Sequence, residues 1–286
     1  MNLIIPSQEL LLQAALRHGN QALVAWREWL ALTDLEHKPI EPGSNALLSL
    51  IYGNLTMGAS ASVDKGEGAV IPLLGRLRGI YRRTWYANET YFRAVGAVLM
   101  RLADAGILVL LPNGAALALR FYKQHAFRPV GNPVVWVRAG QALAAVRSLR
   151  QVGWQMTTRL PTPVAALRNL ARRVWPLRDG SGHVLLVHGR SWSERERALW
   201  SAAVPLSVGA GHGLALNPTE QLLLISAQAS CARPGLALSF LADAAQVIRS
   251  SGAAIDWDRI NNQATAQAFV HQVTAISEDM KIAVTS

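Results

Sequence analysis

The spacing of apolar residues changes twice along this chain, and the change restricts what it can fold into. In the N-terminal part, apolar side chains recur about every 3.6 residues, as in amphipathic helices; the segments are 7–32, 44–55 and 71–102. From Gly106 onward the apolar runs are short and continuous, as in buried strands; these runs are 107–111, 134–137 and 183–188. Beyond Thr219 the helical spacing returns. The pattern therefore predicts an α+β chain.

This order of element types predicts three consecutive regions. A helical region covers 1–102, a small α/β core covers 103–190, and a second helical region covers 191–286. The glycine-rich stretch 209–213 is interpreted as an ordinary loop, because it lacks the lysine and the strand-to-helix context of a phosphate-binding loop. Packing between the helical and α/β parts is assigned to seven tryptophans: Trp26, Trp29, Trp85, Trp154, Trp175, Trp200 and Trp257.

The composition excludes several classes of protein. Of 286 residues, 51% are hydrophobic and 16% are charged, which excludes intrinsic disorder and allows a sizeable core. The single cysteine, Cys231, cannot form an internal disulfide, so a reducing compartment is expected. The N-terminus lacks the features of a signal peptide, and the uncharged runs 105–119 and 198–219 both contain proline and asparagine. We therefore expect a cytoplasmic protein without a membrane span.

Positive charge is concentrated in the middle of the chain. Residues 71–197 hold 20 basic and 5 acidic side chains, a net charge of +15, whereas the whole chain has +10. Such a segment indicates an anionic partner, although arginine on a solvated helix face explains the same pattern. The candidates for an anion-binding surface are Arg76, Arg78, Arg82, Arg83, Arg172 and Arg173.

Carboxylates are missing where the α/β core is predicted. No Asp or Glu occurs from Ala105 to Arg178, and none occurs between Gly180 and Ser193. Chemistry that needs clustered carboxylates cannot take them from these stretches.

Several segments, in order, resemble a bacterial family of uncharacterised nucleotidyltransferases in the polymerase-β-like superfamily. Residues 105–117 are similar to the family's strand, turn and helix, and 128–137 resemble its arginine–proline–x–glycine–aspartate–x–aspartate motif. Residues 182–188 resemble its aspartate–leucine–histidine–tryptophan segment. The N-terminal and C-terminal helical segments fit the family as well, so the resemblance covers nearly the whole chain. It implies a small mixed-sheet, palm-like core between N-terminal helices and a C-terminal helical bundle.

The chain departs from the family at the positions that hold metal ions. The resemblance places Asn132 and Val134 at the two aspartates of the second strand, and Leu186 at the third carboxylate. The lysine beside the turn glycine is replaced by Asn113. Because two-metal nucleotidyl transfer needs carboxylate oxygens around Mg²⁺, the departures imply that this chemistry has been lost. We therefore expect no bound Mg²⁺ and no resident cofactor, while a nucleotide remains a possible ligand.

Parts of the ancestral site remain as candidates for ligand contact. Each has a structural alternative: Gly114 could serve a tight turn, and His188 could be a buried histidine whose ring nitrogens are hydrogen-bonded within the core. The ligand-binding candidates are Asn113, Gly114, Arg128, Asn132, Trp136 and His188.

Three functions are compatible with this pattern. The first is a nucleotidyltransferase-like pseudoenzyme that acts as an accessory subunit and binds a protein, a peptide or an anionic ligand. The second is an active transferase of nonstandard mechanism. The third is a basic nucleic-acid-binding module, which ranks last because no known nucleic-acid motif is visible.

Overall fold

The computed structural model describes residues 5–33, 40–57, 71–157, 174–190, 194–232 and 237–276. The chain divides into two compact units, and each unit is built from separate segments of the sequence. One unit, called here the helical unit, comprises 1–86, 118–129 and 221–286. The other, the sheet unit, comprises 87–117 and 130–220. The division into regions 1–102, 103–190 and 191–286 stays a prediction.

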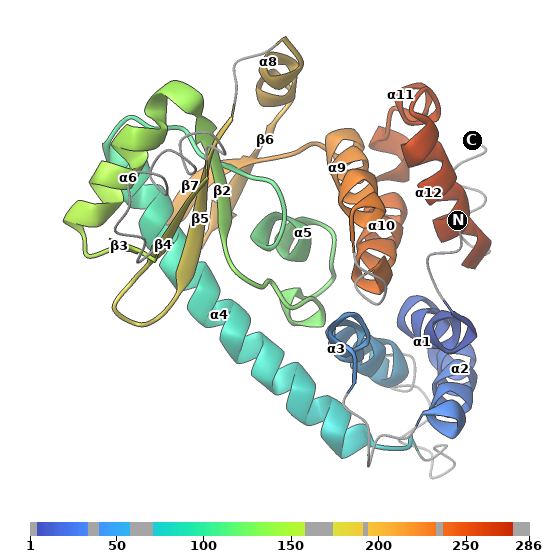
Figure 1. The fold of residues 1–286 in the computed structure, drawn as a ribbon. Helices are drawn as coiled ribbons and strands as arrows, with labels where there is room; N and C mark the ends of the chain where they lie inside the picture. The colour runs from blue at the N-terminus through green and yellow to red at the C-terminus, as the bar shows by residue number, and fades with distance from the viewer. Residues whose placement is uncertain are drawn as a thin grey trace. The chain divides into compact units, whose positions relative to one another are not determined.

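The sheet unit contains a mixed sheet in the order β3-β4-β5-β2-β1-β7-β6. Figure 1 labels most of its strands. Strand β2 pairs in parallel with β5 and β1 with β7, whereas the other neighbours are antiparallel. This confirms the predicted α+β class with a mixed sheet. The strands are β1 (Leu110–Leu111), β2 (Val134–Arg138), β3 (Gln155–Met156), β4 (Val174–Arg178), β5 (Val184–Arg190), β6 (Val204–Val208) and β7 (Gly211–Ala215).

Helices precede and follow the sheet, as the apolar spacing predicts, and further helices lie between its strands. The early ones are α1 (Pro6–Leu16), α2 (Gly19–Leu32), α3 (Pro42–Met57) and α4 (Leu74–Asp104). Those between strands are α5 (Ala115–Arg120), α6 (Ala142–Gln151) and α8 (Glu194–Ser201), with short 3-10 turns η2 (His125–Phe127) and η3 (Ala139–Gln141). The last are α9 (Pro218–Ser230), α10 (Ala237–Ser251), η4 (Gly252–Ala254), α11 (Trp257–Asn261) and α12 (Ala264–Ile276). None of the helices within the described ranges is long and apolar enough to span a bilayer.

One face of the central strands is buried and the other is half-buried. Along β5 the burial alternates, because successive side chains of a strand point to opposite faces. Leu185 and Val187 are fully buried on the face that packs against α6. Gly189 lies on that face too, and a Cβ there would approach the Cβ of Ala142 at the start of α6 to 3.0 Å. The opposite face carries the candidate site residues.

The hairpin of β6 and β7 corrects the interpretation of residues 209–213 as a loop and of the region from 191 onward as helical. Residues 211–213 lie in β7, and Gly209 forms the hairpin turn with a φ of 56°. The glycines allow β7 to lie directly on α4: a Cβ on Gly211 would be 2.7 Å from the Cβ of Leu99. Alternating glycines removed the apolar signal of a strand, so the sequence pattern missed this one.

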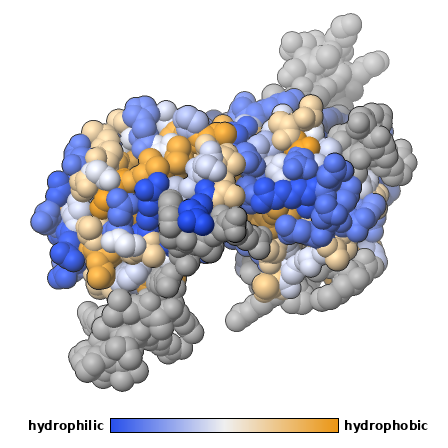
Figure 2. All heavy atoms as spheres, turned by 90° about the horizontal axis from the view of Figure 1, so that it is seen from above, coloured by the Kyte–Doolittle hydropathy of each residue, from blue (hydrophilic) through white to orange (hydrophobic). Residues whose placement is uncertain are grey.

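The helical unit has its own core. Helix α1 packs against α2, α3 and α10, and its Leu11 and Leu12 are fully buried. Trp26 and Trp29 of α2 stack with ring centroids 5.1 Å apart, and the Trp26 indole N–H donates to the carbonyl of Pro72. Trp85 contradicts the packing role predicted for it, since 46% of its surface is exposed. On the face of the molecule seen in Figure 2, hydrophilic and apolar side chains are interspersed.

Candidate functional site

The candidate site lies on the half-buried face of the sheet unit, across β1, β2 and β5. These strands are adjacent, with Val134 opposite Leu186 and Trp136 opposite His188. Leu110 of β1 is opposite Trp136 on the other side. The structure therefore brings together residues that are more than fifty positions apart in the sequence.

The positions that the resemblance assigns to metal ligands form a neutral patch. Val134 and Leu186 are direct neighbours in register, and both are half-buried. Pro176 of β4 lies opposite Leu186 and extends the apolar surface, while Asn132 is exposed just before β2. Mg²⁺ requires several oxygen ligands, and carboxylates are its usual protein ligands. Two aliphatic side chains and one amide do not fit this ion.

The rest of the described chain gives no alternative metal site. Within the described ranges, no three or more His, Cys, Asp or Glu side chains are grouped so that they could hold a metal ion. Asp179 is the single acidic residue between Ala105 and Ser193. Its side chain accepts hydrogen bonds from the backbone N–H groups of Ser181 and His183 in the β4–β5 turn. Its carboxylate also contacts the ring of His183 at 2.7 Å. Although burial opposes it, these hydrogen bonds together lower the pKa of Asp179.

Asn113 and Gly114 follow β1 and precede α5, near the start of antiparallel β2. Gly114 has a φ of 54°, a conformation that favours glycine. A Cβ at this position would be 3.0 Å from the carbonyl oxygen of Val130 and 3.2 Å from the hydroxyl of Tyr91. Protein atoms fill the space next to Gly114, which favours the structural role of this residue over phosphate contact.

Trp136 already has a cation on its ring. The guanidinium carbon of Arg190 lies 4.3 Å from the centroid of the Trp136 ring, within the range of a cation–π interaction. Arg190 also forms an ion pair with Glu196 of α8. This arrangement closes one end of the patch and leaves the aliphatic pair as its central feature.

His188 points to the same face as Leu186, because the two are separated by one residue on β5. Its Nε2 is buried and has no hydrogen-bond partner among the described residues. Burial, and then the positive charge of Arg190, lower the pKa of His188 below its ordinary value of 6.5. The imidazole is therefore neutral at pH 7.

This pKa shift predicts a pH dependence of stability. Below about pH 6.5 His188 is protonated in the unfolded chain, whereas the folded chain resists this protonation. The free energy of unfolding therefore falls as the pH falls. The slope from one such group is at most about 1.4 kcal/mol per pH unit. We expect His188→Gln to flatten the dependence of the unfolding midpoint on pH between 7 and 5, measured by urea denaturation. His271→Gln, at an exposed position of α12, is the control. Equal slopes for His188→Gln and wild type would contradict the assignment.

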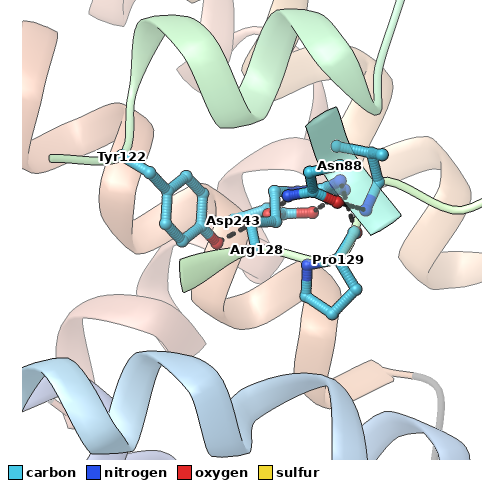
Figure 3. A network of polar contacts seen from close by, with 6 residues as sticks. Asn88, Tyr122, Arg128, Pro129 and Asp243 are labelled. Atoms are coloured by element: carbon cyan, nitrogen blue, oxygen red, sulfur yellow. Dashed lines mark hydrogen bonds and ion pairs between the residues drawn. The ribbon is translucent and has the colours of Figure 1, made fainter. Parts of the chain in front are cut away.

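Arg128, a candidate for ligand contact, lies in the helical unit in a polar network with Asp243 of α10 (Figure 3). Its Nε donates to Oδ1 of Asp243 at 2.6 Å and its Nη2 donates to Oδ2 at 2.8 Å. The Tyr122 hydroxyl donates to Oδ1 of the same carboxylate at 2.7 Å. Burial, followed by the charge of Asp243, raises the pKa of Tyr122 well above 10.0. This geometry favours a structural role for Arg128.

The segment after Arg128 is fixed separately inside the sheet unit. Asn88 of α4 is 1% exposed, and its Oδ1 accepts a hydrogen bond from the backbone N–H of Val130 at 3.2 Å (Figure 3). Gly131 follows with a φ of 61° and turns the chain toward β2. Asn88 therefore positions the entry to the strand that carries Val134.

The basic candidates divide into described and undescribed residues. Arg76, Arg78, Arg82 and Arg83 are all exposed on the first half of α4, in the helical unit. Arg172 and Arg173 lie outside the described residues.

The sequence interpretation missed three residues that shape these surfaces. Arg190 follows His188 by two positions on β5, so strand alternation alone could have placed it on the candidate face. Asp243 gives no local signal, because its partner Arg128 is 115 positions away. Trp85 follows a run of arginines, a context that is more typical of a surface than of a core.

Residues 50–279 match the family described as "Uncharacterised nucleotidyltransferase". Among curated proteins, no relative matches the chain. One similar solved structure is an antigenic nucleotidyltransferase-like protein from Paracoccidioides brasiliensis, with a TM-score of 0.48, 12% identity, and coverage of 70% of this chain and 92% of that one. Another is the antibiotic-resistance factor ANT(2'')-Ia, with a TM-score of 0.44, 10% identity, and coverage of 66% and 96%. The family match covers residues 50–279, which is most of the chain. This chain therefore belongs to the family of uncharacterised nucleotidyltransferases.

Proposed function

We propose that this protein is a nucleotidyltransferase-family member that does not perform metal-dependent nucleotidyl transfer and acts as a binding subunit. The observation that carries the proposal is the in-register pair Val134 and Leu186, at two positions assigned to metal-holding carboxylates. Two aliphatic side chains there can neither coordinate Mg²⁺ nor offset the charge of a triphosphate.

The chemistry of the same face supports a protein or peptide ligand. Val134, Leu186 and Pro176 are neighbours across three strands, and all three are half-buried. An apolar segment of a partner protein placed on this face would remove their exposed surface from water, which is favourable by about 25 cal/mol per Å² of apolar area. A nucleoside triphosphate would bring negative charge onto an apolar surface whose flanking cation, Arg190, already forms an ion pair with Glu196.

One observation favours a second candidate, a transferase of nonstandard mechanism. Neutral His188 lies on the same face as Leu186, and its Nε2 has no partner within the described part of the chain. A neutral imidazole can accept a proton from an attacking hydroxyl. Transfer without added metal that disappears in His188→Gln would support this candidate over the first.

Calorimetric titration of ATP, GTP, CTP and UTP into the full chain, with and without Mg²⁺, tests the proposal. No binding of any nucleotide is expected in the presence of Mg²⁺. A parallel incorporation assay with labelled nucleotides should give no transfer product. Tight Mg²⁺-dependent binding together with transfer would overturn the proposal.

Restoring the carboxylates gives a stronger prediction. The variant Asn132→Asp/Val134→Asp/Leu186→Asp places acids on neighbouring strands, where they would share one ion. We expect it to bind Mn²⁺ at least about 10-fold more tightly than wild type, because carboxylates supply both oxygen ligands and charge. Mn²⁺ titration followed by electron paramagnetic resonance measures the affinity.

The matched control keeps the size and polarity of the new side chains without their charge. Val134→Asn/Leu186→Asn should bind Mn²⁺ no better than wild type. Wild-type binding as tight as that of the acidic variant would show that these three positions are not the former metal site.

A further inference from the structure

The first half of α4 displays an exposed surface that combines cations and aromatic rings. Arg78, Arg82 and Trp85 follow one another at spacings of four and three residues, so they share one helix face. Arg83 and Tyr86 lie beside them, and Tyr86 is 69% exposed. Trp85 is 46% exposed, although burying a tryptophan would be favourable.

The charges on this helix face are placed unfavourably for an isolated helix. Arg76 and Arg78 lie near the N-terminus of α4, where the helix dipole repels cations. Arg78 and Arg82 repel each other at a spacing of four residues. No Asp or Glu occurs between Leu74 and Asn88. The side chains of Arg76, Arg78, Arg82 and Arg83 form no hydrogen bond or ion pair with a described residue. An anionic ligand would relieve this repulsion.

A cleft of about 390 Å³ opens beside Trp85 within the helical unit. Its lining includes the rings of Tyr81, Trp85 and Tyr122 and the ammonium of Lys123, with no acidic side chain. Tyr81 is held in place by a hydrogen bond from its hydroxyl to Gln124 at 2.7 Å. The volume lies within the range of about 300–1000 Å³ that is typical of small-ligand pockets. Aromatic side chains in a lining of this kind favour a ligand with a planar ring.

We propose that this surface binds single-stranded nucleic acid. The arginines of α4 contact phosphates, and an unstacked base enters the cleft and stacks on Trp85. Exposed aromatic rings favour a single strand, because a duplex hides the faces of its bases. The helix from Arg76 to Tyr86 is about 15 Å long, which matches about four nucleotides of a stacked strand. The surface shares no residue with the patch of Val134 and Leu186, so the inference stands or falls independently of the proposed function.

Fluorescence anisotropy tests the proposal with the full chain and 5′-labelled dT12 and U12. We expect the logarithm of the association constant to fall linearly with the logarithm of the salt concentration. The slope should be about −3, as four phosphate contacts require. Trp85→Ala should weaken binding by at least about fivefold, and Trp85→Phe should retain most of it. Arg78→Gln/Arg82→Gln should reduce the salt slope by about 1.4.

The control removes the same charge elsewhere. Arg147→Gln/Arg150→Gln changes two exposed arginines of α6 in the sheet unit and should leave affinity and slope unchanged. Comparing dT12 with U12 shows whether the strand is DNA or RNA. Equal or tighter binding of a 12-base-pair duplex, or an effect of the α6 control as large as that of the α4 variant, would overturn the proposal. So would binding that Trp85→Ala leaves unchanged, or no binding of either strand at 50 mM salt.

Discussion

Asp243→Ala is expected to lower the free energy of unfolding by about 3–5 kcal/mol, the range for removing one partner of a buried ion pair. The Asp243 side chain is 2% exposed, and that of its partner Arg128 is 16% exposed. The substitution leaves the Arg128 guanidinium without its bidentate acceptor and the buried Tyr122 hydroxyl without its acceptor. Urea denaturation followed by circular dichroism measures the effect.

Two further variants separate the contributions to this network. Tyr122→Phe removes a single hydrogen bond and should cost about 1 kcal/mol. Arg128→Met/Asp243→Ala removes both charges. It should cost less than the sum of the costs of Arg128→Met and Asp243→Ala measured separately, because no unpaired buried charge remains in the double variant. Additive effects, or an Asp243→Ala cost below about 1 kcal/mol, would show that the ion pair does not stabilise the helical unit.

The local sequence pattern predicted most of the elements around the candidate site. Runs of apolar residues placed β2 and β5 within one residue of their observed start and within two of their end, because a buried strand must be continuously apolar. The acid-free stretch from Ala105 to Arg178 excluded a carboxylate cluster there in any alignment. The structure adds that Val134 and Leu186 are paired, a fact of sheet register that no local pattern contains.

Long-range contacts account for what the pattern missed. Arg128 is a plausible ligand contact when considered alone, and only its pairing with Asp243 on α10 indicates a structural role. Trp85 was assigned to packing because tryptophans are usually buried, yet its position on α4 leaves it exposed. The β6–β7 hairpin was missed because its glycines serve contact with α4, and glycine gives no strand signal.

Gly96→Ala and Gly79→Ala, both in α4, are expected to change stability in opposite directions. A Cβ on Gly96 would lie 2.6 Å from the carbonyl oxygen of Val208 at the β6–β7 turn. The backbone of the turn or of α4 would have to move to make room for the new methyl group. Overpacking of this kind costs about 1–3 kcal/mol, more than the helix propensity that alanine adds.

At Gly79 a Cβ meets no atom within 4 Å and the residue is exposed, so alanine should stabilise the helix by about 0.8–1 kcal/mol. Because both substitutions make the same chemical change in one helix, the difference between their unfolding free energies isolates the contact with the hairpin. Urea denaturation of the two variants and wild type measures this difference. A Gly96→Ala variant as stable as Gly79→Ala would mean that the β6–β7 hairpin does not pack closely against α4 at Gly96.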